Sequence, residues 1–153
     1  MTDIGTQAPD FTLPDETGTE VTLSALTGEP VVLYFYPRDD TPGCTTEALD
    51  FTALLPEFQA AGARVFGISK DTVAKHGKFR EKRDLAVTLL SDAESDVCER
   101  YGVWVEKNMY GKKSMGIQRA TFLIDADGKI ARAWPKVKVA GHAAEVLDAV
   151  RAL

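Results

Sequence analysis

Cys44 is the residue of this sequence whose type and position most favour nucleophilic chemistry. It directly follows Pro42 and Gly43, which interrupt regular structure, and it precedes an amphipathic stretch at 51–58. We therefore expect it in the first turn of a helix. An ordinary thiol is only about 3% thiolate at pH 7, but the amides and dipole of a helix N-terminus favour the anion. The position predicts a reactive thiolate.

The neighbours of Cys44 suit the binding of a small polar substrate. Thr41 places a hydroxyl three residues before the sulfur, Pro42 removes a competing amide, and Gly43 allows close approach of a ligand. Glu47, one turn later, acts in the opposite direction, because a nearby negative charge disfavours a thiolate. We therefore expect a cation from elsewhere in the fold.

The remaining candidate ligands and nucleophiles do not form a metal site. The two cysteines, Cys44 and Cys98, are too few for a disulfide scaffold and form no CxxC pair or Cys/His cluster. His76 and His142 lie in polar stretches without partners at ligand spacing, so we expect both to be exposed to solvent. We expect no metal and no cofactor.

The composition fits one globular domain that covers residues 1–153. Hydrophobic residues make up 44% and charged residues 27% of the chain, close to the globular average. The net charge of −5 disfavours binding to nucleic acid. The longest apolar run, at 31–36, is far shorter than the about 20 residues of a membrane span. We therefore expect a cytoplasmic protein with no membrane partner.

The hydrophobic pattern predicts strands that alternate with helices. Apolar runs at 31–36 and 63–69 are typical of strands covered on both faces, and with the helix that starts near Cys44 they form a β-α-β unit. The other predicted elements are a hairpin at 12–13 and 21–23, helices at 73–83 and 95–101, a strand at 87–90, a loop at 106–114, a hairpin at 120–124 and 130–134, and a C-terminal helix around 143–150. The fold class is therefore α/β, with a central mixed β-sheet, helices on both sides and an N-terminal β-hairpin.

The pattern Pro37-x-x-x-Thr41-x-x-Cys44 resembles the peroxidatic-cysteine motif of the peroxiredoxins, in particular the subgroup of bacterioferritin comigratory protein or peroxiredoxin Q. Further matches at 5–13, 67–71 and 119–125 extend the resemblance over nearly the whole chain. It implies a thioredoxin-like fold with peroxiredoxin additions. The implied activity is that of a thiol-dependent peroxidase, which reduces hydrogen peroxide and organic hydroperoxides.

The resemblance also implies roles for individual residues. Cys44 is the attacking thiolate, Thr41 a hydroxyl partner of the bound peroxide, Pro37 a shield over the pocket, and Arg119 the distant cation. Attack on the peroxide converts the cysteine to a sulfenic acid, which a second thiol must reduce. Thioredoxin, glutaredoxin or a small thiol are the reductants that we expect, and we favour a monomer over a dimer.

The source of that second thiol is where the sequence departs from better-known members of the family. A resolving cysteine five residues after the first is absent, because position 49 is Leu, and the next predicted helix holds none either. We therefore favour a one-cysteine cycle that an external thiol completes. A two-cysteine cycle with Cys98 as the resolving thiol is the alternative, although Cys98 has the spacing of an ordinary core residue.

Two other kinds of function compete with a peroxidase. A dithiol-disulfide oxidoreductase is disfavoured, because it normally needs two cysteines close in sequence. A non-catalytic thioredoxin-like binding or holdase module is the second of these, since a fold by itself does not establish chemistry. Replacement of Cys44 by Ser separates this alternative from an enzyme, because it leaves binding intact and abolishes peroxidase activity.

Overall fold

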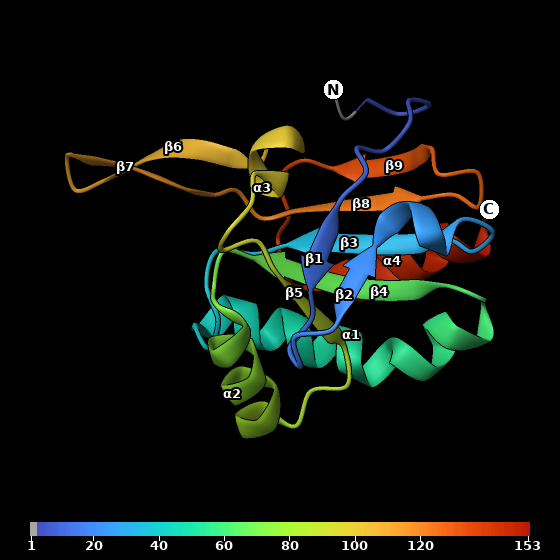
Figure 1. Ribbon diagram of the computed structural model, residues 1–153, viewed down its shortest axis with the longest axis horizontal. Helices are drawn as coiled ribbons and strands as arrows, with labels where there is room; N and C mark the ends of the chain where they lie inside the picture. Colours follow the sequence, from blue (N-terminus) through green and yellow to red (C-terminus); the bar gives the residue numbers. More distant parts are fainter. Residues whose placement is uncertain (1–2) are drawn as a thin grey trace.

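A five-stranded mixed sheet forms the centre of the computed structural model, which describes residues 3–153 apart from the side chain of Met109 (Figure 1). Its strand order is β5-β4-β3-β8-β9. The central strand β3 (Val31–Phe35) runs parallel to β4 (Arg64–Ser69) and antiparallel to β8 (Ala120–Ile124). Every residue of β3 is buried, as the continuous apolar run predicts. The predicted α/β fold class with a mixed sheet is confirmed.

The outer strands and the N-terminal hairpin also match their predictions. Strand β5 (Thr88–Ser91) is parallel to β4, and β9 (Ile130–Trp134) is antiparallel to β8. Strands β1 (Thr12–Pro14) and β2 (Glu20–Thr22) pair antiparallel in a small sheet of their own. A short 3-10 helix, η1 (Leu23–Leu26), connects this hairpin to the segment before β3.

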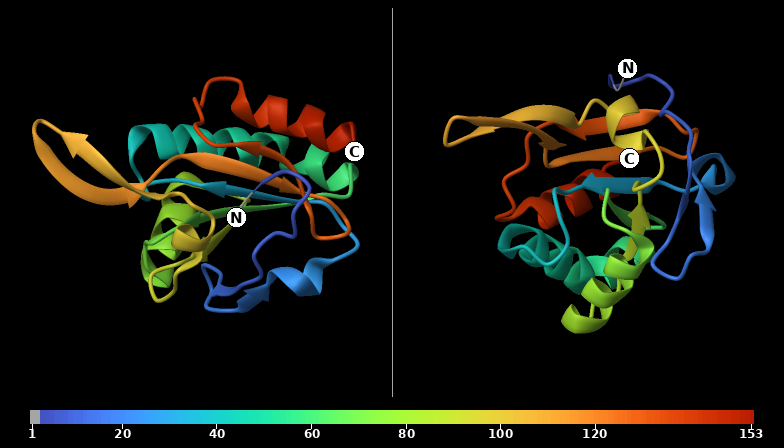
Figure 2. Two further views of the ribbon diagram at one scale, coloured as in Figure 1. Left: turned by 90° about the horizontal axis from the view of Figure 1, so that it is seen from above. Right: turned by 60° about the vertical axis from the view of Figure 1, so that its left-hand side comes forward.

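Helices cover both faces of the central sheet. The long helix α1 (Pro42–Ala60) and the C-terminal helix α4 (His142–Arg151) pack side by side on one face (Figure 2). The short helix α3 (Val97–Arg100) and the β1–β2 hairpin lie over the other face (Figure 2). Helix α2 (Val73–Arg83) packs beside β5. In the described part of the chain, no helix combines the length and apolar character needed to cross a membrane.

The prediction of a loop at 106–114 is wrong, because these residues belong to a β-hairpin. This hairpin projects from the body of the protein as an arm (Figures 1 and 2). Strand β6 (Trp104–Met109) pairs antiparallel with β7 (Lys112–Ile117). At the tip, Tyr110 and Gly111 adopt φ angles of 53° and 80°, which suit a tight hairpin turn. The strands bury little against the domain, so their sequence lacks the apolar alternation by which strands are recognised.

The expectation that both histidines are exposed is also wrong. His76 and His142 are buried, and each ring has hydrogen-bonding partners from distant parts of the chain. The Nε2 atom of His142 lies 2.8 Å from the hydroxyl of Thr121 on β8. Buried polar groups require such partners, and neighbouring polar residues in a sequence do not reveal them.

Candidate active site

The start of α1 places Cys44 in the first helical turn, as predicted. Thr41 is the N-cap residue in an extended conformation, and Pro42 and Gly43 are the first helical residues. Proline suits this position, because the first amides of a helix have no partner within the helix. The Thr41 hydroxyl donates a hydrogen bond to the carbonyl of Arg38 at 2.9 Å. The loop between β3 and α1 is thereby fixed next to the cysteine.

Arg119 supplies the cation that the sequence leads us to expect beside Cys44. Its Nη2 donates to the Cys44 sulfur at 3.2 Å, and its Nη1 donates to Glu47 Oε1 at 2.5 Å. Burial alone lowers the pKa of Arg119, but the negative charges of Glu47 and Cys44 outweigh that effect and raise it above the usual value. The guanidinium therefore stays charged and places a positive charge beside the sulfur.

Glu47 is buried in the same site, with only 1% of its surface exposed. Burial raises the pKa of this carboxyl to about 7, although Arg119 acts in the opposite direction. Its second oxygen, Oε2, has no hydrogen-bonding partner among the described residues. Two acidic groups, the Cys44 thiol and Glu47, thus share a single guanidinium.

Gly43 makes room for Arg119. A Cβ atom at this position would lie 3.2 Å from Arg119 Nη2, closer than most such contacts. From the sequence, we expect this glycine to allow the approach of a ligand. In the structure, it also allows a side chain of the same site to approach.

Pro37 and Thr41 lie on an open groove of about 630 Å³ beside the start of α1. The other side of this groove is formed by the β6–β7 arm, through Trp104, Lys107 and Ile117. Cys44 itself is nearly buried, with 2% of its surface exposed. The arm, which the sequence alone presents as a loop of unknown role, is therefore a wall of the groove next to the cysteine.

Cys98 lies on the opposite face of the central sheet from Cys44. It packs in the same apolar cluster as Leu33 of β3, whereas Cys44 packs with Val32. Adjacent residues of a strand point to opposite faces, so the sheet separates the two thiols. The structure therefore does not bring the two cysteines together.

The surroundings of Cys98 suit an unreactive core residue. Its backbone amide donates to Asp92 Oδ2 at 2.8 Å. Burial, with the negative charge of Asp92 as a further cause, raises the pKa of the thiol well above its usual value. A thiol of this kind is protonated near neutral pH and is a poor nucleophile.

Comparisons with known proteins agree with this fold. Residues 4–133 match the model of the AhpC/TSA family. Peroxiredoxin Bcp of Xanthomonas campestris is 50% identical over 156 residues, which cover 99% of this chain and 98% of the relative. Peroxiredoxin Bcp of Bacillus subtilis is 47% identical over 149 residues, which cover 97% of this chain and 95% of the relative.

Solved structures show the same relationship. A structure of the Xanthomonas campestris bacterioferritin comigratory protein, from work on its alkyl peroxide reduction activity, superposes with a TM-score of 0.91 at 49% identity and covers 98% of each chain. A variant of Xylella fastidiosa PrxQ gives a TM-score of 0.94 at 41% identity and covers 99% of this chain and 97% of the other. The predicted thioredoxin-like fold is confirmed by these neighbours. The chain belongs to the AhpC/TSA family, as a peroxiredoxin of the Bcp or Q group, and is a thiol-dependent peroxidase.

Proposed function

We propose that Cys44 is the nucleophile that reduces hydrogen peroxide and organic hydroperoxides in this peroxiredoxin. The observation that carries the proposal is the hydrogen bond of 3.2 Å from Arg119 to the Cys44 sulfur, in the first turn of α1. A fixed guanidinium and the amides of a helix N-terminus both stabilise a thiolate, which is the reactive form of cysteine.

In the proposed reaction, the thiolate attacks one oxygen of the peroxide. A sulfur–oxygen bond forms while the oxygen–oxygen bond breaks, so the sulfur gives up two electrons and the peroxide gains them. The leaving oxygen departs as hydroxide or alkoxide and takes up a proton to become water or an alcohol. Cys44 is left as a sulfenic acid. The guanidinium of Arg119 stabilises the negative charge that develops on the oxygens.

Thr41 and Pro37 would complete the peroxide site. The Thr41 hydroxyl donates its own proton to Arg38, so its lone pairs are available to accept the proton of a bound hydroperoxide. This contact would align the peroxide for attack by the sulfur. Pro37 lines the groove next to Thr41 and has no amide proton, so it would shield the site without competing for the substrate.

Glu47 would hold Arg119 in position in this scheme. Its carboxylate accepts from Nη1, which leaves Nη2 directed at the sulfur. The fork geometry of a guanidinium suits this arrangement, in which one residue contacts two acidic groups. A lysine, with a single nitrogen on a flexible chain, would not contact both groups in the same way.

The cycle would be completed by an external thiol. That thiol attacks the sulfenic sulfur and releases water, and a second thiol then cleaves the resulting mixed disulfide to restore Cys44. The position of Cys98 on the opposite face of the sheet supports this one-cysteine cycle over a two-cysteine cycle. The reductants that we propose are thioredoxin, glutaredoxin or a small thiol.

The proposed setting is a monomer in the cytoplasm. One chain supplies all five groups of the proposed site, namely Pro37, Thr41, Cys44, Glu47 and Arg119. A cycle that depends on external thiols also requires a compartment that keeps thiols reduced, and the cytoplasm is such a compartment.

Steady-state peroxide consumption with dithiothreitol tests the proposal. The wild type and Cys98→Ser are expected to consume peroxide, whereas Cys44→Ser is expected to be inactive. Activity in Cys44→Ser would overturn the assignment of the nucleophile. Loss of activity in a folded Cys98→Ser variant would overturn the one-cysteine cycle.

A further inference from the structure

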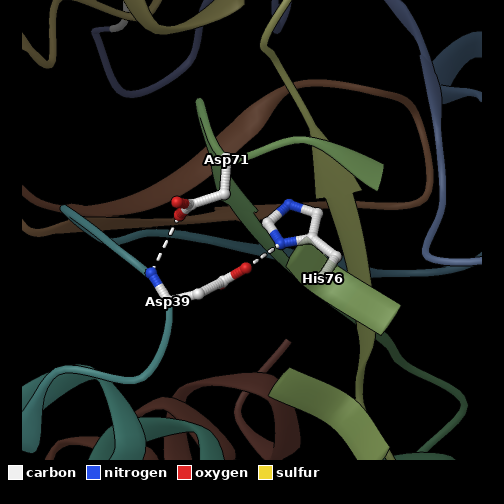
Figure 3. Close-up of side chains that lie close together, drawn as sticks. All are labelled: Asp39, Asp71 and His76. Atoms are coloured by element: carbon white, nitrogen blue, oxygen red, sulfur yellow. Dashed lines mark hydrogen bonds and ion pairs between the residues drawn. The ribbon is translucent and has the colours of Figure 1, made fainter. Parts of the chain in front are cut away.

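His76 links helix α2 to the loop that precedes Cys44. The side chain is fully buried, although it lies on a polar helix. Its Nε2 lies 2.9 Å from the carbonyl oxygen of Leu90 on β5, and its Nδ1 lies 2.6 Å from Asp39 Oδ2 (Figure 3). Three elements that are distant in sequence therefore meet at one imidazole ring.

The two contacts of His76 require two hydrogens. The Leu90 carbonyl only accepts hydrogen bonds, so Nε2 must carry a hydrogen. The contact between Nδ1 and Asp39 Oδ2 then needs a second hydrogen, either on the ring or on the carboxyl group. In both arrangements a hydrogen bond joins the loop to the helix.

Asp39 makes two further hydrogen bonds, through its second carboxylate oxygen and its backbone amide. Its Oδ1 accepts a hydrogen bond from the Tyr36 hydroxyl at 2.6 Å, and its amide donates to Asp71 Oδ2 at 2.8 Å (Figure 3). Asp71 in turn accepts from the hydroxyl of Ser69 on β4 at 2.6 Å. Asp39 is thus a hydrogen-bonding partner of both Asp71 and His76, which argues for a structural link and not for a metal site.

Asp39 lies in the middle of the loop that carries residues of the proposed peroxide site. It lies midway between Pro37 and Thr41, the two loop residues of the proposed peroxide site. The next residue, Asp40, has a φ angle of 59°, which is unfavourable for a residue other than glycine. Such a conformation persists only where the surroundings hold it in place.

Helix α2 contacts this loop at a second point, but that contact is weak. Asp40 pairs with Lys82 and Arg83 at the surface, where all three side chains are substantially exposed. Exposed ion pairs typically contribute only about 0 to 1 kcal/mol. Loss of one partner from a buried pair costs more, because the other partner is left without its hydrogen bond. The contact between Asp39 and His76 is therefore the stronger link.

We propose that His76 is a positioning residue for peroxide reduction, which acts through Asp39 to hold the loop at 37–41 beside Cys44. The inference rests on the proposed role of Cys44, and it adds a residue outside the peroxide-binding motif. His76 does not touch the reacting atoms. Its effect is to keep Pro37 and Thr41 where they shape the peroxide site.

The test is the second-order rate constant for oxidation of Cys44 by hydrogen peroxide, measured by rapid mixing and quenching. Displacement of catalytic groups by about 1 Å can cost about 100-fold, so His76→Ala and Asp39→Ala are each expected to react about 10- to 100-fold more slowly. The double variant is expected to be no slower than the slower single variant, because both substitutions break one link. The rate at which dithiothreitol reduces the sulfenic acid is not expected to fall.

A conservative substitution of Asp39 distinguishes a positioning role from an effect of the negative charge and from an effect of lost folding. In Asp39→Asn, the amide nitrogen can donate to Nδ1 of neutral His76 while the amide oxygen still accepts from Tyr36, so the oxidation rate is expected to stay within a few-fold of the wild type. Phe79→Leu is the matched control, because Phe79 is buried on the same helix and lies outside this hydrogen-bond network. That variant loses packing but keeps the link, so its oxidation rate is expected to be unchanged.

Two results would overturn the inference. One is a folded His76→Ala variant whose Cys44 is oxidised as fast as in the wild type. The other is an Asp39→Asn variant as slow as Asp39→Ala, which would show that the hydrogen bonds do not position the loop. If His76→Ala does not fold, the comparison of the oxidation rates of Asp39→Asn and Asp39→Ala still tests the inference. Failure of wild-type Cys44 to be oxidised would instead contradict the proposed function, so the two kinds of failure are distinguishable.

Discussion

The guanidinium of Arg119 lies 3.2 Å from the sulfur of Cys44, although 75 positions separate the two residues in the chain. Strand β8 begins directly after Arg119 and pairs with β3, and β3 leads into the loop before Cys44. The pairing of these two strands therefore brings the cation to the cysteine. The proposed site therefore depends on the pairing of strands in the sheet as much as on the motif around Cys44.

Removal of this cation is the first prediction. We expect Arg119→Met to slow the oxidation of Cys44 by about 100- to 1000-fold, the usual effect of losing one preorganised donor to a transition-state charge. Arg151→Met is the control, because Arg151 is exposed and remote from the site. Stopped-flow oxidation rates and circular dichroism of both variants check the prediction. An Arg119→Met variant that reacts as fast as the control would contradict it.

The Glu47 carboxyl predicts a pH dependence of stability. Its pKa is about 7 in the folded protein and 4.5 without the fold, so between these pH values the native state binds more protons than the unfolded state. The contribution of Glu47 to the free energy of unfolding is therefore most favourable below about pH 4.5 and is lost as the pH rises to about 7.

Chemical denaturation of the wild type and Glu47→Gln at several pH values measures this contribution. The glutamine keeps an oxygen that can accept from Arg119 but does not titrate. We expect the free energy of unfolding of the wild type, relative to this variant, to fall as the pH rises from 4.5 to 7. A difference that is constant or rises over this range would contradict the account.

Cys98 is predicted to resist alkylation in the folded protein. Burial and Asp92 keep this thiol protonated, and the sheet separates it from the site of Cys44. Iodoacetamide at pH 7.5, followed by mass spectrometry of the intact chain, is expected to modify Cys44 first and Cys98 only after denaturant is added. Modification of Cys98 at the same rate in native and denatured protein would show that the thiol is accessible.

Gly43→Ala is predicted to slow the oxidation of Cys44 without lowering stability. Alanine is favoured over glycine in a helix by up to about 1 kcal/mol, so the substitution is expected to preserve or increase stability. Its methyl group would displace the guanidinium of Arg119, whose Nη2 lies 3.2 Å from the point that the new Cβ atom would occupy, so the oxidation rate is expected to fall.

Gly77→Ala provides the matched comparison for that prediction. Gly77 is also helical, and a Cβ atom there would make an ordinary contact of 3.5 Å with the backbone of Glu16. This variant is expected to gain stability without slower oxidation. Thermal unfolding and oxidation rates of Gly43→Ala and Gly77→Ala test the prediction. Equal oxidation rates would show that space for Arg119 at Gly43 is unimportant.

Much of the fold follows from local sequence patterns. The apolar run at β3 predicts a central strand, and the break at Pro42 and Gly43 predicts the start of α1 beside Cys44. Both signals lie in a few consecutive residues, so they can be recognised without knowledge of the tertiary structure. The arm at 104–117 has no such signal, because its strands pair mainly with each other and bury little.

The contacts of the site are less predictable, because they are made between distant segments. Arg119 is expected at the site only through the family resemblance, since nothing in its local sequence distinguishes it from a surface arginine. The burial of His76 escapes prediction because its partners, Asp39 and Leu90, are 37 and 14 positions away. Such contacts depend on how the strands are ordered in the sheet, which periodicity does not reveal.

The most direct test of the account is peptide mapping by mass spectrometry after one equivalent of hydrogen peroxide, in the presence of a trap for sulfenic acids. We predict one trapped adduct per chain, located on Cys44, with Cys98 recovered as a free thiol. A bridge between Cys44 and Cys98, or an adduct on Cys98 while Cys44 stays reduced, would contradict it.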